Sequence, residues 1–201
     1  MSSDYRLILG SRRSIRRYRD EPVPEELIKR LLEAAAWAPS AHDRQPWRFA
    51  IVKEASTRER LGHAMGERLL ADLAAEGQDA EEAARRAERS RQRVVTAPVL
   101  LLVCMTMAGS SCPAGRVRAQ REHHMAAQSV AAAIENLLLA ASAEGLGACW
   151  VGAPLYCPDT VSDALSLPED WEPQALITLG YPAEWKRPVE RPMAAGMVIY
   201  R

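Results

Sequence analysis

The chain has 201 residues, 48% of them hydrophobic, and its 26 basic residues balance its 26 acidic residues. This length and apolar content predict a folded chain with a real core and exclude a disordered one. The zero net charge argues against nucleic acid as a partner, because nucleic-acid binders carry a basic excess. The four cysteines form no Cys-x-x-Cys pair and no apolar leader follows Met1. We therefore expect reduced thiols and a cytoplasmic location.

After an expected helical turn at residues 4–11 comes an arginine-rich stretch, Ser11-Arg12-Arg13-Ser14-Ile15-Arg16-Arg17-Tyr18. Arginine grips phosphate with a planar fork of N–H donors. Arg12, Ser14 and Arg16 alternate, so in an extended backbone they point to the same side, where they could converge on one anion. The stretch fits a solvated basic turn equally well, and on its own it does not decide between the two interpretations.

The later elements mix helices and strands without regular β-α-β alternation, which predicts an α+β domain over residues 1–201. Pro24 suits the first turn of a helix, and Ser56 with Glu59 fits a capping box. Helices are expected at 24–37, 56–75, 79–94, 121–144 and 159–165, the last capped by Asp159. Strands are expected at 47–53, 99–105, 147–152, 174–181 and 197–200, with loops at 38–47 and 107–118.

Two apolar stretches lie close together in the second half of the chain. The run from Met125 to Ala143 is interrupted by Gln128, Glu135 and Asn136, which predicts a buried helix and not a membrane span. Residues 147–152 are expected to form a buried strand whose small residues let a ligand approach the backbone. Trp150 within that strand could form the wall of a site for a planar ring.

The sequence carries few motifs for protein-based catalysis. The histidine and cysteine spacings do not resemble a zinc site, and there is no Gly-x-Ser-x-Gly elbow. Neither a Walker A motif nor Gly-x-Gly-x-x-Gly is present. If a nucleotide binds, arginines must hold its phosphate. We therefore expect neither a metal site nor a catalytic nucleophile.

Three blocks read together resemble the flavin-dependent nitroreductase family. They are Arg12 to Tyr18, the loop Ala38-Pro39-Ser40-Ala41-His42-Asp43-Arg44-Gln45-Pro46-Trp47, and Gly145-Leu146-Gly147-Ala148-Cys149-Trp150-Val151-Gly152-Ala153. The resemblance implies an α+β fold with a mostly antiparallel central sheet flanked by helices. It further implies an intertwined homodimer with one FMN at each end of the interface.

The resemblance also assigns cofactor-binding residues. Asp43 stands where many family members have asparagine, and a carboxylate cannot donate a hydrogen bond to a carbonyl of the flavin ring. The implied FMN-binding set is Arg12, Ser14 and Arg16 for the phosphate, with Arg13 beside them, Pro39, Ser40, Ala41 and Asp43 toward the flavin of the other subunit, Cys149, Trp150, Val151, Gly152 and Ala153 along the reactive edge of the ring, and Arg191, Arg187 or Lys186 from the C-terminal arm.

The activity that the resemblance implies is a ping-pong FMN-dependent oxidoreductase, in which reduced flavin passes hydride from N5 to a conjugated acceptor. The flavin does the chemistry, so no protein nucleophile is required. Segment 165–173 and the helix-rich region 61–95 are also similar to the FMN reductase domain of the bifunctional coenzyme F420 biosynthesis protein. That likeness suggests a dehydro-F420 precursor as acceptor, and a nitroaromatic or quinone is the general alternative.

Several points stay open at this level. The electron donor, for which NAD(P)H is a candidate, leaves no motif in the sequence. The 107–118 loop is expected to be mobile and to close over the acceptor. The competing interpretations are a general NAD(P)H nitroreductase unrelated to F420, a flavin or nucleotide binder without activity, and an interaction protein with a basic surface patch. Neither a membrane nor a nucleic acid is expected as a partner.

Overall fold

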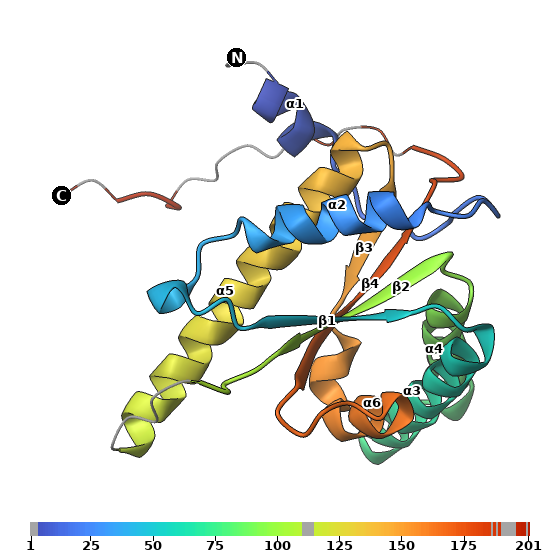
Figure 1. Ribbon diagram of the computed structural model, residues 1–201. Coiled ribbons are helices and arrows are strands. Elements are labelled where there is room, and N and C mark those ends of the chain that lie inside the picture. Colours follow the sequence, from blue (N-terminus) through green and yellow to red (C-terminus); the bar gives the residue numbers. More distant parts are fainter. Residues whose placement is uncertain (1–3, 110–114, 186, 188, 190–195, 200) are drawn as a thin grey trace.

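The computed structural model describes residues 4–109, 115–185, 187, 189, 196–199 and 201. Its helices and strands alternate irregularly along the chain, as the sequence predicts (Figure 1). The helices are α1 (Asp4–Ser11), α2 (Glu25–Ala36), α3 (Ala55–Ala75), α4 (Ala80–Val95), α5 (Arg116–Ala143) and α6 (Pro158–Leu165), with short 3₁₀ turns η1 (Ala41–Asp43) and η2 (Ala153–Tyr156). The strands are β1 (Trp47–Val52), β2 (Val99–Met105), β3 (Gly147–Val151) and β4 (Glu172–Gly180).

The four strands form one sheet in the order β1-β2-β4-β3, and every neighbouring pair is antiparallel. The continuous apolar run of β2 is buried along its whole length, as expected for a strand covered on both faces. β4 lies beside it in the centre, whereas β1 and β3 form the two edges. The α+β fold with a mostly antiparallel sheet is thereby confirmed.

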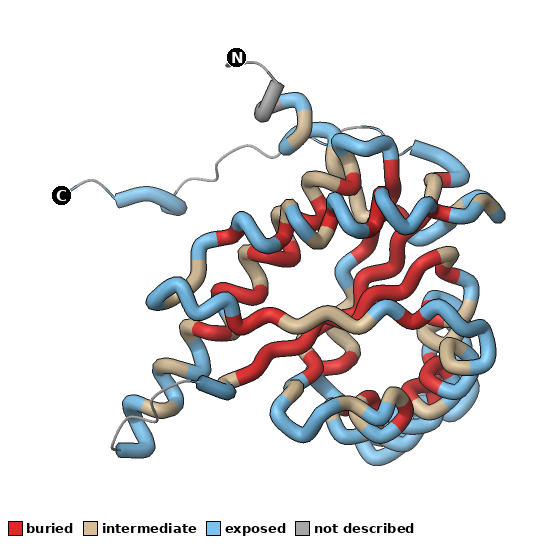
Figure 2. The backbone as a smooth tube through the Cα atoms, viewed as in Figure 1, coloured by how far each residue is buried: buried red, intermediate tan, exposed pale blue. Residues whose placement is uncertain are grey.

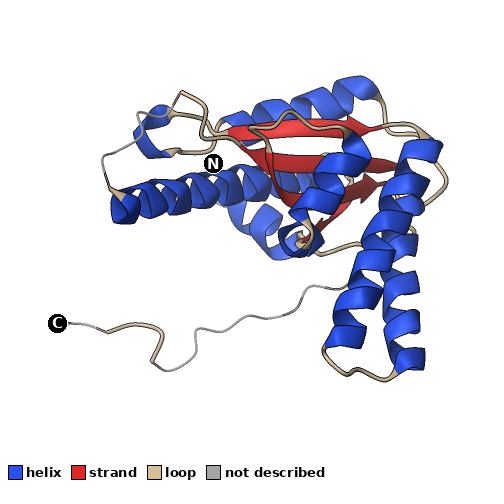
Figure 3. Cartoon of the chain, turned by 90° about the horizontal axis from the view of Figure 1, so that it is seen from below, coloured by secondary structure: helices blue, strands red, loops and turns tan. Residues whose placement is uncertain are grey.

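Helices cover both faces of the sheet (Figures 1 and 2). One core is formed by α2, α5 and the side chains that β1, β2 and β4 direct toward them, and it contains Leu31, Leu137 and Ile177. The opposite core lies under α3, α4 and α6 and contains Leu61, Leu102 and Val161. Figure 3 shows α3 and α4 side by side, forming a helical hairpin at one side of the sheet.

The long helix α5 is apolar enough and long enough to cross a membrane by length and composition alone. Its residues Val130, Ala133, Ile134 and Leu137 are instead almost completely buried against the sheet. The expected buried helix is therefore observed. It ends where the sequence indicates, because Gly145 adopts the left-handed conformation, with φ of +75°, just after it.

Some predicted boundaries are wrong. α5 begins at Arg116 and not at residue 121, so part of the expected loop is helical. Ser56 lies inside α3, whose N-cap is Glu54, so the predicted capping box does not form. Asp159 lies inside α6, and the N-cap there is Cys157. Residues 197–199 are exposed and form no strand. β3 is buried only over its first three residues, because it is an edge strand whose end faces solvent.

Gly147 is required by close packing at the start of β3. A Cβ atom built on Gly147 would lie 2.7 Å from Cβ of Ile15, a side chain that is 2% exposed. Such a contact is too short for any side chain, and Ile15 cannot move without leaving the core. The glycine therefore allows the segment after α1 to lie directly against the sheet.

We predict that Gly147→Ala destabilises the protein by about 1–3 kcal/mol through overpacking against Ile15. The matched control is Gly66→Ala in α3, where the added Cβ would meet its neighbours at an ordinary 3.7 Å. Alanine in a helix interior is favoured over glycine, so this control should gain about 0.5–1 kcal/mol. Urea unfolding curves measure both effects, and equal stabilities of the two variants would contradict the packing argument.

Candidate functional site

The arginine-rich segment lies along the outer edge of β3. Ser14 forms a parallel bridge with Ala148, and the Ile15 amide donates to the Ala148 carbonyl at 3.0 Å. Ile15 is buried, so the alternation of an extended backbone turns its neighbours Ser14 and Arg16 to the opposite side. The predicted extended arrangement of this segment is therefore present, and it is anchored to the sheet.

The arginines of this segment have different partners. Arg12 Nε forms an ion pair with Glu135 of α5 at 3.2 Å. Arg13 donates from Nε to the backbone carbonyl of Arg187 at 3.1 Å, which places the described part of the C-terminal arm beside the segment. Arg16 is exposed, and within the described part of the chain no carboxylate oxygen lies within 4.0 Å of its guanidinium. Its charge is therefore available to an anion from outside.

A hollow of about 510 Å³ opens beside Arg16. Its lining consists of Ile15, Arg16, Arg17, Ala183 and Glu184. The Ala183 amide donates to the Arg17 carbonyl at 3.1 Å, which holds the far wall of the hollow against the segment. The space is large enough for a phosphate group and the chain that carries it.

Tyr18 fastens the segment to the centre of the sheet. Its hydroxyl donates to the Ile15 carbonyl at 2.6 Å and lies 2.7 Å from the hydroxyl of Thr178 on β4. Burial raises the pKa of the Tyr18 phenol above its ordinary value, although the Thr178 hydrogen bond opposes this shift. The group therefore remains a neutral hydrogen-bonding anchor between the Ile15 carbonyl and Thr178 of β4.

Beyond Ala148, the end of β3 is open to solvent. Cys149 is buried, but Trp150 is 40% exposed, Val151 and Gly152 are partly exposed, and Ala153 begins η2. A Cβ atom built on Gly152 would meet nothing within 4 Å. A flat ring can approach the backbone there beside the indole, so the residues present fit a flavin whose phosphate lies near Arg16.

The loop before β1 is held in a strained conformation. His42, Asp43 and Gln45 all have positive φ, between 48° and 56°, although none is glycine. Ser40 Oγ accepts from the Gln45 amide at 3.1 Å, and the Ala41 amide donates to Ser129 Oγ of α5 at 3.1 Å. Such strain costs roughly 1–3 kcal/mol per residue and concentrates at functional sites. The loop is thus a fixed shape tied to α5.

The structure brings together only two of the three predicted blocks. The arginine segment adjoins β3, whereas the Pro39–Asp43 loop precedes β1 at the other edge of the sheet. Three strand spacings separate these edges, or about 14 Å. Across the sheet, Ala148 of β3 is in register with Leu179 of β4 and so with Val99 of β2. Trp47 of β1 is in register with Met105, which lies six residues after Val99 on β2. That offset adds about 20 Å along the strands.

Some residues of the prediction lie outside the described part of the chain. They are two of the C-terminal basic residues, Lys186 and Arg191, and the stretch 110–114 of the loop expected to be mobile. Of the C-terminal basic residues in the predicted set, only Arg187 is described, and it is exposed. Asp43 is exposed, and Gln45 Nε2 approaches its carboxylate at 3.5 Å.

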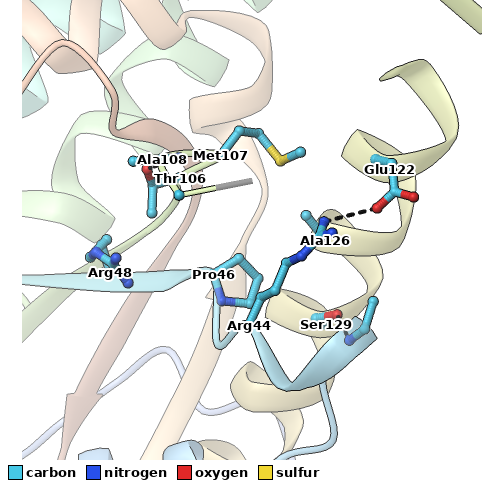
Figure 4. Close-up of a pocket in the computed structure, with 11 residues that line it drawn as sticks. Arg44, Pro46, Arg48, Thr106, Met107, Ala108, Glu122, Ala126 and Ser129 are labelled. Carbon is cyan, nitrogen blue, oxygen red and sulfur yellow. Dashed lines mark hydrogen bonds and ion pairs between the residues drawn. The ribbon is translucent and has the colours of Figure 1, made fainter. Parts of the chain in front are cut away.

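The sequence reasoning missed a second cavity at the start of β1 (Figure 4). It has a volume of about 270 Å³, and its polar lining includes Arg44, Arg48, Thr106, Glu122 and Ser129. Arg44 Nη1 pairs with Glu122 at 2.9 Å across the cavity. These residues come from the loop before β1, from β1, from the residue after β2 and from α5, so no local motif joins them. The one local signal is the Arg-x-x-x-Arg spacing around Pro46.

Comparisons with known proteins agree with this geometry. Residues 9–181 match the nitroreductase family. A "Putative NADH dehydrogenase/NAD(P)H nitroreductase" of Methanothermobacter thermautotrophicus is 34% identical over 180 residues, 88% of this chain and 76% of that protein. A 5,6-dimethylbenzimidazole synthase of Rhodospirillum rubrum is 33% identical over 174 residues, 86% of this chain and 79% of that protein.

A solved structure from Desulfovibrio desulfuricans, described as a putative nitroreductase in complex with FMN, superposes with a TM-score of 0.74. It is 28% identical, and the match covers 100% of this chain and 98% of the other. The chain therefore belongs to the nitroreductase family. The family resemblance seen in the three sequence blocks is confirmed, and with it the predicted enzyme class, an oxidoreductase.

We predict that Tyr18→Phe destabilises the protein by about 1–3 kcal/mol, because it leaves buried partners of the hydroxyl unsatisfied. The difference in the free energy of unfolding between variant and wild type should shrink as pH rises above about 10. Above that pH the Tyr18 phenol ionises in the unfolded wild type but stays neutral in the folded wild type. The free energy of unfolding therefore falls for the wild type and not for the variant. Urea unfolding at pH 8 and above pH 10 measures both effects. Tyr156→Phe, at a side chain 77% exposed, is the control and should change neither. A destabilisation by Tyr18→Phe that grows with pH would contradict the role of Tyr18 as a neutral anchor.

Proposed function

We propose that this chain is an FMN-dependent oxidoreductase that works as a homodimer and reduces a conjugated acceptor. The observation that carries the proposal is the placement of the arginine segment along the outer edge of β3. Within the described residues Arg16 has no carboxylate partner, the hollow beside it lies toward the start of β3, and the exposed Trp150 lies toward the end of the same strand. Family membership and the FMN complex of the Desulfovibrio desulfuricans relative support the same cofactor.

When bound, the flavin would supply the redox chemistry, accepting electrons from a donor such as NAD(P)H and passing hydride from N5 to the acceptor. The chain's own residues bind and orient it. Arg16 and Ser14 would hold the phosphate, with Arg13 and Arg187 adjacent. Trp150, Val151 and Gly152 would support the ring. Arginine charge near the cofactor would also stabilise an anionic reduced form.

The homodimer is proposed because one copy keeps the two halves of the predicted site apart. The Pro39–Asp43 loop lies at the opposite edge of the sheet from the arginine segment, with β2 and β4 between them. A second copy related by two-fold symmetry would bring the loop of one subunit to the β3 edge of the other. The fixed, strained shape of the loop suits a surface that must fit a partner.

The chemical class of the acceptor is the most specific part of the proposed function. The likeness of segment 165–173 and region 61–95 to the coenzyme F420 reductase domain supports a dehydro-F420 precursor. Nitroaromatics and quinones are the acceptors of the general alternative. Anaerobic reoxidation of the reduced protein by each compound separates them. Bound FMN that none of these acceptors reoxidises would instead support a flavin binder without this activity.

We predict that the purified protein shows a flavin absorption spectrum and releases FMN on denaturation. Arg16→Ala should weaken FMN binding by about 1.5–3 kcal/mol, because it removes a charged hydrogen-bond donor to the phosphate. Fluorescence titration of the flavin-free protein measures this. Arg86→Ala, at an exposed arginine of α4, is the matched control and should bind FMN as the wild type does. Equal affinity of the Arg16 variant would remove that residue from the site.

A mixed dimer tests whether the site is shared. Arg16→Ala damages the β3 half of the proposed site, and Ser40→Trp damages the loop half. If each site combines two chains, a dimer of one copy of each variant regains one intact site. We expect tandem-purified mixed dimers to bind about half the wild-type FMN, while each single-variant dimer binds weakly. Mixed dimers that bind no better than the single variants would contradict a shared site.

A further inference from the structure

The cavity beside β1 combines apolar walls with positive charge. Pro46, Met107, Ala108 and Ala126 supply apolar surface, while Arg44, Arg48 and Glu122 are its charged residues. Arg44 is neutralised by Glu122 at 2.9 Å. Thr106 Oγ1 donates to Asp170 at 2.6 Å and so is already engaged. The lining therefore carries one cation, Arg48, without an ion-pair partner among the described residues.

Arg48 presents a particular part of its guanidinium. The side chain starts on the face of β1 opposite Trp47, as strand alternation requires. It folds back around the end of the strand, so that Nη1 donates to the Gln45 and Trp47 carbonyls at 3.2 and 2.8 Å. Within the described part of the chain, no group accepts from its Nε or Nη2. Those two nitrogens form the edge of the fork that binds a carboxylate with two parallel hydrogen bonds.

The size and place of the cavity restrict its ligand. Its volume of about 270 Å³ lies just below the 300–1,000 Å³ of sites for drug-sized ligands, so it suits about one ring with a small substituent. Ala41, in the loop proposed to reach the partner's flavin, also lines the cavity. A compound held here would thus have its ring next to that loop.

We propose that Arg48 selects conjugated acceptors that carry a carboxylate, binding this group through Nε and Nη2 in the cavity beside β1. The inference rests on the proposed function, because it places the acceptor next to the loop that would meet the flavin of the other subunit. Arg48 is a specificity-determining residue in this account. The apolar walls hold the conjugated part of the acceptor, and the guanidinium fixes its direction.

The test uses the FMN-loaded protein reduced with dithionite, which removes the need for a known electron donor. Stopped-flow reoxidation is followed with 4-nitrobenzoate and with nitrobenzene, which differ only in the carboxylate. For Arg48→Met we expect the half-saturating concentration of 4-nitrobenzoate to rise at least about tenfold, the loss of a charged hydrogen-bonded pair. The value for nitrobenzene should stay unchanged, and Arg86→Met is the matched control.

Two outcomes would overturn the inference. One is an Arg48→Met variant that affects both compounds equally, and the other is a wild type that does not prefer the carboxylate. A calorimetric titration of benzoate into the flavin-free protein separates this result from failure of the proposed function. Benzoate binding that is lost in Arg48→Met supports the carboxylate site even if no FMN binds. Benzoate binding that is unchanged in the variant rules the site out.

Discussion

The contact between Ile15 and Gly147 determines where the functional residues lie. Because Gly147 has no side chain, the segment after α1 can approach the edge of β3 and pair with Ala148. Ile15 is then buried, and Arg16 lines the hollow beside the sheet. Tyr18 secures the far end of the same segment through Thr178. The basic residues are thus positioned by packing and hydrogen bonds that themselves involve no ligand.

The same sheet keeps the remaining site residues apart. The Pro39–Asp43 loop is fixed to α5 through Ser129 and lies before β1, at the edge opposite β3. Because β2 and β4 lie between β1 and β3, the two edges of the sheet are held apart within one chain. In the proposed homodimer, the Pro39–Asp43 loop of one copy would complete the β3 half of the site in the other.

Much of the fold could be predicted because local patterns were strong. The apolar run of β2 and the glycine after α5 are examples. The start of α5 was missed because Arg116, Arg118 and Arg121 give no apolar periodicity. The expected capping box is absent because α3 begins at Ala55, one residue before Ser56, so that Glu54 takes the N-cap position. In the site, the alternation of Ser14 and Arg16 about the buried Ile15 matches the expected extended segment, whereas Arg12 pairs with Glu135. The Arg12–Glu135 ion pair and the positive φ of His42 left no local signal, and the cavity around Arg48 left only the Arg-x-x-x-Arg spacing, because all three depend on contacts distant in sequence.

The central claim is that the flavin site is completed by two chains, and the mass of the intact complex tests it most directly. Native mass spectrometry of the purified protein should show a dimer that carries two FMN molecules. On dilution, the FMN should be released as the dimer dissociates. Each monomer then holds one β3 half and one loop half, which lie at opposite edges of the sheet and do not form a complete site. A stable monomer that keeps one tightly bound FMN would contradict the account.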